Sequence, residues 1–247
     1  MPGQSAPRFS IFTLLIVNGY SLIFSPAQAG RIKSKLKMNE AYNIDCMEYM
    51  QNVPDGYFDI AVCDPPYGIK INESIGRRKG DAHSGRKKAY WDAAPPPTEY
   101  FNELRRVSKN QIIWGANYFV SRMPWDSRCW LLWDKKFSDK LSFSQFEMAY
   151  TSFSIGTKKF DKNPTTREKK WHPTQKPVEL YEWIYGLFAK DGDKILDTHL
   201  GSGSSRIAAY KMGLSFVGCE IDGDYFAMEE QRFRNFVEAQ RLQPKLF

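Results

Sequence analysis

Residues 62–71 read VCDPPYGIKI, which joins an acid to an aromatic ring through two prolines. The apolar run just before the acid, Phe58–Cys63, predicts a buried strand. Pro65 and Pro66 lack a backbone N–H and cannot continue a central ladder. We therefore expect Asp64 and Tyr67 on a rigid turn at the carboxyl end of a strand, where open α/β sheets bind ligands. An ordinary strand exit with a capping Asp is the alternative for this stretch alone.

A second candidate site is the stretch KILDTHLGSGSS at residues 194–205. An apolar strand ends on Asp197, and Gly201 and Gly203 let the backbone turn tightly and approach a ligand. Ser204 opens the next predicted helix, so the stretch has the form of a nucleotide cradle. A plain strand-to-helix turn is the alternative.

The cradle departs from the two common nucleotide motifs. Arg206 stands where a dinucleotide fingerprint has its third glycine, and no G-K-[ST] follows, so a P-loop is excluded. Glu220 ends the next predicted strand and suits the two hydroxyls of a ribose. A cofactor with a nucleoside but no pyrophosphate fits, and S-adenosylmethionine is the leading candidate.

The chain of 247 residues has a formal net charge of +7, and the positive charge is unevenly placed. Residues 68–90 carry +5, residues 152–172 carry +4 and residues 1–37 carry +5, which leaves the remainder at −7. Two basic loops on an acidic body are typical of contacts to a phosphate backbone. Flexible solubilising loops are the alternative. The expected contacts are Arg77, Arg78, Lys79, Arg86, Lys87, Lys88, Lys158, Lys159, Lys169 and Lys170.

The four cysteines are scattered, and none of the three histidines is paired at ligand spacing. This pattern predicts reduced, buried thiols and no structural metal.

The first 37 residues look like a leader. Residues 9–24 are apolar, and an A-x-A site at residues 27–29 resembles a secretory signal, but the run is short for a membrane span. Met38 reads as a natural domain start. We expect residues 1–37 to be a mis-assigned start or an extension outside the fold. Residues 38–247 are then a single domain acting in the cytoplasm.

Strands and helices alternate from Met38 onward. Strands are predicted at residues 41–44, 58–63, 111–119, 129–135, 146–153, 194–199 and 215–221. Helices are predicted at residues 47–52, 98–108 with Thr98 as its cap, 178–189, 204–212, and from the last strand to about residue 241. This alternation predicts a doubly wound, mostly parallel α/β sheet.

The D-P-P-Y turn and the D-x-x-x-G-S-G loop in one α/β chain resemble the DNA amino-methyltransferases. The turn precedes the loop by about 130 residues, and HPTQKPVELY stands at residues 172–181, just before the strand of the glycine loop; this order is similar to that of the β group of the family. The resemblance covers about residues 38–236. It implies a Rossmann-like, S-adenosylmethionine-dependent methyltransferase fold with permuted motif order.

Several positions depart from the group's pattern. Thr198, His199 and Ser204 stand where the group commonly has Pro, Phe and Thr, so we expect different packing on the adenine side. The region that would recognise the target has only about twenty residues, as in compact phage or prophage enzymes.

The resemblance also implies residue roles. Asp64 and the carbonyl of Pro65 accept hydrogen bonds from the target amine, Pro66 stiffens the turn, and Tyr67 stacks on the flipped base. The implied cofactor contacts are Asp45, Cys46, Asp64, Lys176, Asp197, His199, Leu200, Gly201, Gly203, Ser204, Glu220, Ile221 and Asp222. Lys176 would face the cofactor carboxylate. The DNA cleft would be lined by Trp91, Asp92, Tyr118 and Trp125, and core packing is the role expected for Trp114.

The implied substrate is an adenine N6 in double-stranded DNA, because Asp at the first motif position leans toward adenine. Cytosine N4 is the near alternative. RNA or protein methylation and an inactive DNA-binding regulator are further ones. The protein is expected to be a monomer or a homodimer without a metal or a membrane partner.

Overall fold

The computed structural model describes residues 13–17, 20–24, 39–69, 92–137, 144–164, 171–172 and 174–242. The chain divides into two units, Met1–Met38 and Asn39–Phe247. In the first unit, β1 (Thr13–Val17) and β2 (Tyr20–Phe24) form an antiparallel hairpin. The predicted domain start at residue 38 lies at this division, and the standing of residues 1–37 stays a prediction.

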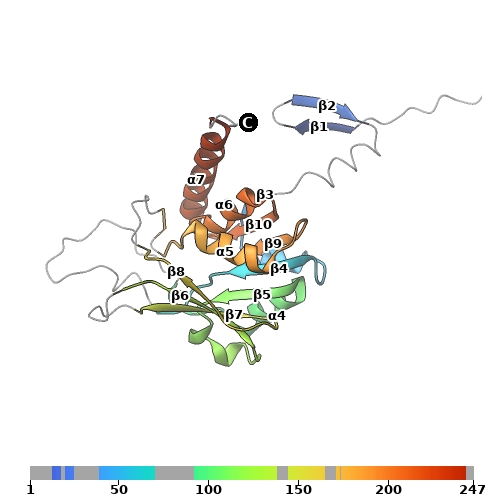
Figure 1. Cartoon of the computed structure of the whole chain (residues 1–247). Coiled ribbons are helices and arrows are strands. Elements are labelled where there is room, and N and C mark those ends of the chain that lie inside the picture. Colours follow the sequence, from blue (N-terminus) through green and yellow to red (C-terminus); the bar gives the residue numbers. More distant parts are fainter. Residues whose placement is uncertain are drawn as a thin grey trace, which may run out of the picture. The chain divides into compact units, whose positions relative to one another are not determined.

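The second unit is built on an eight-stranded sheet with the order β3–β10–β9–β4–β5–β7–β6–β8 (Figure 1). Its strands are β3 (Asn39–Asn43), β4 (Phe58–Cys63), β5 (Ser108–Trp114), β6 (Cys129–Asp134), β7 (Phe146–Thr151), β8 (Lys158–Asp161), β9 (Lys194–Asp197) and β10 (Ser215–Glu220). Its helices are α2 (Cys46–Gln51), α4 (Thr98–Val107), α5 (Val178–Phe188), α6 (Ser204–Lys211) and α7 (Gly223–Leu242), with the 3₁₀ turns η2 (Ala116–Tyr118) and η3 (Val120–Arg122).

Most strand pairs in this sheet are parallel. β3, β10, β9, β4 and β5 pair in parallel, whereas β7 runs antiparallel to both β5 and β6. β8 pairs in parallel with β6 at the far edge. The predicted α/β class with a mostly parallel sheet is confirmed.

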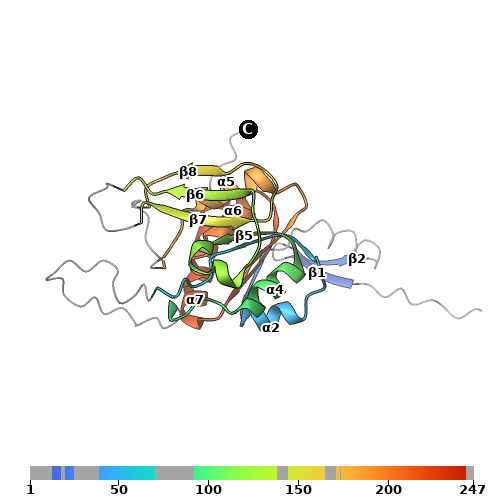
Figure 2. The same ribbon diagram turned by 90° about the horizontal axis from the view of Figure 1, so that it is seen from below.

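Helices cover both faces of the sheet, because successive residues of a buried strand point to opposite sides. Ile60 and Val62 of β4 pack in a core that includes α5 and α6. Ala61 and Cys63 pack in a second core with α2 and α4. Figure 2 shows α2 and α4 side by side, which agrees with their direct contact. The sheet is therefore doubly wound, as predicted.

The predicted end of the strand at residues 111–119 is wrong. β5 begins at Ser108, directly after α4, and ends at Trp114 instead of continuing to residue 119. Gly115 has a φ of +70°, which turns the chain into η2. The strand is replaced there by η2 and η3: Ala116 and Phe119 are buried in the core, whereas Tyr118 and Val120 are exposed.

Two further predictions are corrected. Thr98 is the first residue of α4, and the N-cap is Pro97, which has no side-chain capping bond. The basic segment 152–172 contains a strand, β8, instead of forming one loop. Its short KKFD sequence carries two lysines, a composition that protects edge strands from aggregation and also hides them from an apolar pattern.

All four cysteines are free thiols; Cys63, Cys129 and Cys219 are buried, and Cys46 is half-buried. Within the described residues, no helix has the length and apolar character needed to cross a membrane.

Candidate active site

The sheet topology brings the two sequence motifs together. β4, which precedes the DPPY turn, pairs in parallel with β9, which precedes the glycine loop, so that Ile60 faces Ile195 and Ala61 faces Leu196. From this pair the chain proceeds to β5 on one side and to β10 on the other. Such a switch point leaves a crevice outside the carboxyl ends of the strands.

A cavity of about 300 Å³, here called the large cavity, lies at this edge. It is lined by Asp64, Pro66, His172, Thr174, Gln175, Lys176, Tyr181, His199, Leu200, Gly201, Ser202, Ser204, Glu220, Ile221 and Tyr225. Eight of the predicted cofactor residues are in this lining: Asp64, Lys176, His199, Leu200, Gly201, Ser204, Glu220 and Ile221. Among the described residues, the other five lie outside it: Asp45, Cys46, Asp197, Gly203 and Asp222.

Glu220 is fixed in the large cavity by backbone donors. The N–H of Gly201 donates to Oε2 at 2.9 Å, and the N–H of Asp222 donates to Oε1 at 2.9 Å. Burial raises the pKa of Glu220, although both backbone N–H groups favour the charged form. A carboxylate has about four lone-pair sites, so Glu220 can still accept from two hydroxyls. Asp222 therefore shapes the site through its backbone.

Asp197 braces the glycine loop from beneath. Its side chain is buried, accepts a hydrogen bond from the N–H of His199 at 3.0 Å, and accepts another from the hydroxyl of Ser205. Burial raises the pKa of Asp197 to about 7, against the effect of these two donors. The carboxylate thus fixes the start of the loop instead of lining the cavity.

The last helix holds the other side of the loop. Arg232 of α7 donates to the carbonyl of Ser202 at 2.7 Å and contacts the hydroxyl oxygen of Ser204 at 2.9 Å. Gly203 has a φ of +72°, and a Cβ there would lie 2.5 Å from Cγ of Glu229. The loop therefore fits against α7 only with glycine at this position.

Arg206, which replaces the third glycine of a dinucleotide fingerprint, ties α6 to α7. Its Nη1 lies 2.9 Å from Glu229 and 2.5 Å from Glu230. The sequence showed only what Arg206 excludes, since its partners lie on distant parts of the chain.

Two histidines face the large cavity in uncharged form. Burial lowers the pKa of His199 to about 4, and burial together with Lys176 does the same for His172. His199 contacts the hydroxyl of Thr198 at 3.0 Å and meets the ring of Tyr100 edge-on. Thr198 and His199, which replace Pro and Phe in the family pattern, thus form a hydrogen bond with each other.

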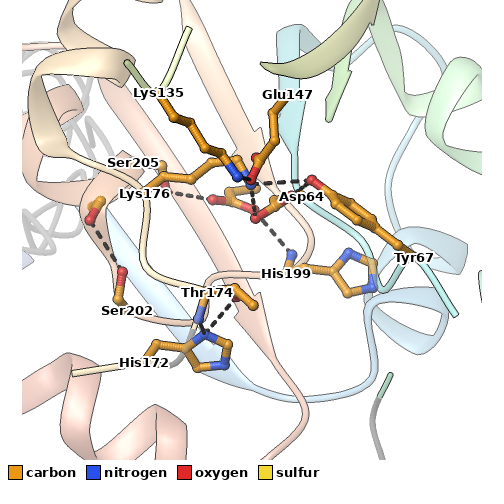
Figure 3. Close-up of polar contacts among 12 residues, drawn as sticks. Asp64, Tyr67, Lys135, Glu147, His172, Thr174, Lys176, His199, Ser202 and Ser205 are labelled. Carbon is orange, nitrogen blue, oxygen red and sulfur yellow. Dashed lines mark hydrogen bonds and ion pairs between the residues drawn. The ribbon is translucent and has the colours of Figure 1, made fainter. Parts of the chain in front are cut away.

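On the DPPY turn, both oxygens of Asp64 are bound (Figure 3). The hydroxyl of Tyr67 donates to Oδ1 at 2.6 Å, and Nζ of Lys176 donates to Oδ2 at 2.5 Å. Burial raises the pKa of Asp64, an effect that Lys176 opposes. Lys176 therefore acts on the predicted catalytic acid as well as lining the large cavity.

Lys176 has a second carboxylate partner that no sequence motif indicated. Its Nζ lies 3.0 Å from Oε2 of Glu147 on β7, and Oε1 of Glu147 lies 2.5 Å from Nζ of Lys135. Figure 3 shows Lys135 and Glu147 approaching Lys176 together. Nothing in the sequence around Glu147 marks it, because an acid on a half-buried strand is usually solvated.

A smaller cavity of about 40 Å³, here called the small cavity, adjoins the DPPY turn. It is lined by Asp64, Pro65, Pro66, Tyr67, Asp92, Glu147, Thr174 and Lys176. Four of these residues also line the large cavity: Asp64, Pro66, Thr174 and Lys176. Asp92, predicted for the DNA cleft, accepts a hydrogen bond from the N–H of Gly68 at 2.8 Å and so fixes the end of the turn.

The predicted aromatic set divides between site and core. Tyr118 stacks on Tyr67 with ring centroids 5.1 Å apart. Trp114 is fully buried, as its core role predicts. Trp125 packs against Tyr150 and under Arg105. Trp91 lies outside the described residues.

Two of the predicted DNA contacts, Lys158 and Lys159, are exposed on β8. Lys159 forms ion pairs with Asp134 at 3.6 Å and Asp161 at 3.0 Å, which reduces the charge it offers to a phosphate. The other predicted contacts lie outside the described residues: Arg77, Arg78, Lys79, Arg86, Lys87, Lys88, Lys169 and Lys170.

Comparison with known proteins agrees with this geometry. A family model described as a DNA methylase of the N6/N4 type matches residues 113–231. The type II methyltransferase M.HinfI of Haemophilus influenzae is 24% identical over 248 residues, spanning 80% of this chain and 68% of the relative.

Solved structures share the fold. The complex of M1.HpyAVI with S-adenosylmethionine superposes with a TM-score of 0.53 at 19% identity, covering 78% of this chain and 98% of that one. The cytosine-N4-specific PvuII DNA methyltransferase gives a TM-score of 0.54 at 11% identity, covering 81% and 90%.

A glycine loop that donates to Glu220, set beside a DPPY turn in permuted order, is the arrangement of the S-adenosylmethionine-dependent amino-methyltransferases of the β type. Over residues 113–231 the chain is similar to the N6/N4 family of DNA methylases.

Proposed function

We propose that this protein transfers a methyl group from S-adenosylmethionine to the exocyclic N6 of an adenine flipped out of double-stranded DNA. The observation that carries the proposal is the position of Asp64, whose side chain lines both the large and the small cavity. A methyl donor in the large cavity and an amine in the small cavity would meet at this carboxylate.

The large cavity fits a nucleoside donor. The left-handed turn at Gly201 brings backbone close to the cavity, Glu220 offers free lone pairs to ribose hydroxyls, and His199 and Leu200 supply an uncharged wall. When bound, the donor supplies an activated methyl group on a positively charged sulfur. Lys176, Ser204 and Ile221 complete the predicted contacts.

The DPPY turn prepares the amine. A lone pair delocalised into the base is a weak nucleophile, and two hydrogen bonds to Asp64 and the carbonyl of Pro65 draw the nitrogen toward tetrahedral geometry. A donor held in the large cavity would supply the methyl group and leave as a neutral thioether, and the proton lost by the amine would pass to the Asp64 carboxylate and from there to solvent. The small cavity has room for only a few waters, so its lining must move apart when a base enters.

Adenine is favoured over cytosine because the turn begins with Asp, a preference that rests on resemblance alone. Cytosine N4 is the second candidate, and the fold shared with the cytosine-N4-specific PvuII enzyme favours it. RNA or protein methylation is less well supported, since such enzymes usually place N-P-P-Y after the glycine loop.

DNA as the partner is supported by the two basic segments and by the family. We infer from DNA as the substrate that the protein works in the cytoplasm; that it is a monomer or a homodimer stays a prediction.

The test uses the full chain, isotopically labelled S-adenosylmethionine and unmethylated double-stranded DNA, with digestion to nucleosides and mass spectrometry. We expect label on N6-methyladenine, lost in Asp64→Ala and retained in Asp55→Ala, an exposed acid paired with Arg106. Label on N4-methylcytosine would overturn the adenine assignment and keep the mechanism. Unlabelled DNA from a protein that still binds the donor would overturn the proposed function.

A further inference from the structure

Glu147 belongs to neither the DPPY turn, the glycine loop nor the HPTQKP segment, yet its carboxylate lines the small cavity. It stands between two lysines, with Nζ of Lys135 at 2.5 Å and Nζ of Lys176 at 3.0 Å. Lys176 in turn reaches Asp64 at 2.5 Å. Four charges of alternating sign therefore run from Lys135, at the end of β6, to Asp64 on the DPPY turn.

Lys176, the cation between the carboxylates of Glu147 and Asp64, is deeply buried. Only 4% of the residue is exposed, and its Nζ lies 5.5 Å from the ring centroid of Trp114 and 5.7 Å from that of Tyr67. A buried ammonium is costly unless it is paired. Burial alone would lower the pKa of Lys176, but Asp64 and Glu147 outweigh it and raise the pKa. Lys176 is therefore held as a cation.

Glu147 is firmly placed to hold this cation. It sits within the antiparallel pair of β6 and β7, opposite Trp133, and Lys135 follows directly after β6. Burial would raise the pKa of Glu147, but Lys176 and Lys135 outweigh it and lower the pKa. Glu147 thus keeps its negative charge inside the protein.

A second anchor changes what Asp64 can do. If Lys176 had Asp64 as its sole partner, the ammonium would stay on the oxygen that must accept the target amine. With Glu147 holding the ammonium, Asp64 can offer a lone pair to the amine while Lys176 remains compensated. Lys176 then still orients Asp64 and favours its ionised form.

We propose that Glu147 is a positioning residue for methyl transfer: it anchors Lys176 between two carboxylates, so that Asp64 is oriented and free to accept the target amine. This inference rests on the proposed function and adds to it a residue outside the family motifs.

The decisive variant is Glu147→Gln, which keeps the shape and removes the charge. We expect kcat for DNA methylation to fall at least tenfold, while the Kd for S-adenosylmethionine, measured by calorimetry, changes less than threefold. The acidic limb of the kcat–pH profile should move to lower pH, because Glu147 is one of the charges that raise the pKa of Asp64. A purely structural role would not move this limb. Glu147→Asp, which keeps the charge, should return the limb toward that of the wild type.

The matched control is Glu182→Gln, which removes a similarly half-buried glutamate from its ion pair with Lys211. Melting temperatures report folding for all variants. An active wild type with Glu147→Gln indistinguishable from Glu182→Gln in kcat and pH profile would overturn the inference. A fall in kcat matched by lost donor binding, or accompanied by an unmoved acidic limb, would also overturn it. A wild type that leaves DNA unmethylated would overturn the proposed function and this inference with it.

Discussion

The ring of Tyr67 lies against the backbone of Gly115 so closely that a Cβ at residue 115 would fall 2.0 Å from Cε1 of the ring. Gly115 has a φ of +70° and directly follows β5, the strand beside β4. The neighbouring strand thus determines where the aromatic ring of the DPPY turn can lie. The stacked ring of Tyr118, from the turn that follows Gly115, completes this support.

Gly115→Ala should displace Tyr67 and with it the hydroxyl that donates to Asp64. We expect at least a tenfold fall in kcat and a loss of stability of about 1–3 kcal/mol, because the left-handed backbone and the clash both oppose alanine. Donor binding should be nearly unchanged. Gly156→Ala is the control, since nothing lies within 4 Å of a Cβ there. Full activity in Gly115→Ala would contradict this assignment for the ring.

Arg232→Met should loosen the glycine loop from α7. The carbonyl of Ser202 and the hydroxyl of Ser204 lose their shared donor, and we expect the Kd for S-adenosylmethionine to rise about tenfold, equivalent to about 1.4 kcal/mol. Calorimetric titration measures this change. Arg234→Met is the control, because Arg234 is exposed on the same helix. Equal affinities in the two variants would show that the loop holds its form without α7.

Glu220→Gln should weaken the binding of S-adenosylmethionine more strongly than Arg232→Met. The neutral amide has one acceptor oxygen in place of two, so it cannot serve Gly201, Asp222 and the ribose hydroxyls together. Hydrogen bonds to charged groups contribute about 1.5–3 kcal/mol, which predicts a Kd roughly 10–100-fold higher. Glu238→Gln, at an exposed site on α7, serves as the comparison. An unchanged Kd would remove Glu220 from the cofactor contacts.

Asp197→Asn should alter how stability depends on pH. The folded pKa of Asp197 is about 7, above the ordinary carboxyl value, so the folded state binds this proton more tightly than the unfolded state. The contribution of Asp197 to stability is therefore greatest at low pH and is lost as pH rises through 7. The amide can accept from the N–H of His199 and donate to Ser205, so the variant keeps both contacts.

Urea unfolding at pH 5 and pH 8 measures this effect. Relative to the wild type, Asp197→Asn should gain more stability at pH 8 than at pH 5, by on the order of 1–3 kcal/mol. Glu229 keeps some pH dependence in both proteins, since burial also raises its pKa to about 7. A larger gain at pH 5 would contradict the sign of the shift.

The regular elements were largely predictable from the sequence. The strand Phe58–Cys63 is found with its predicted bounds, because its apolar run indicates a buried strand and the two prolines that follow prevent the strand from continuing. The end of β5 was missed because WGANYF stays apolar after the strand stops. Its turn depends on Gly115, and that glycine is required by Tyr67, a residue far away in the sequence.

The site was predictable where it follows motifs and unpredictable where it depends on contacts. Asp64, Gly201 and Glu220 lie at the ends of strands, so pattern and topology suffice to bring them together. Glu147 and Arg232 act through partners on other elements, and their own surroundings in the sequence carry no signal. Asp197 shows the converse: its motif marked it for the cofactor, but its oxygens are bound by Ser205 and His199 beneath the loop.

The sheet order also constrains how the protein is made. In the part of the chain that the structure describes, β3 pairs with β10 alone, and β9 fills the place between β10 and β4. β3 is therefore synthesised first but gains its partner only after β10 has been made. Contacts of such long sequence separation slow folding. A nascent chain released before residue 215 would carry a complete DPPY turn but neither β10 nor Glu220, so the large cavity can form only after β10 has been made.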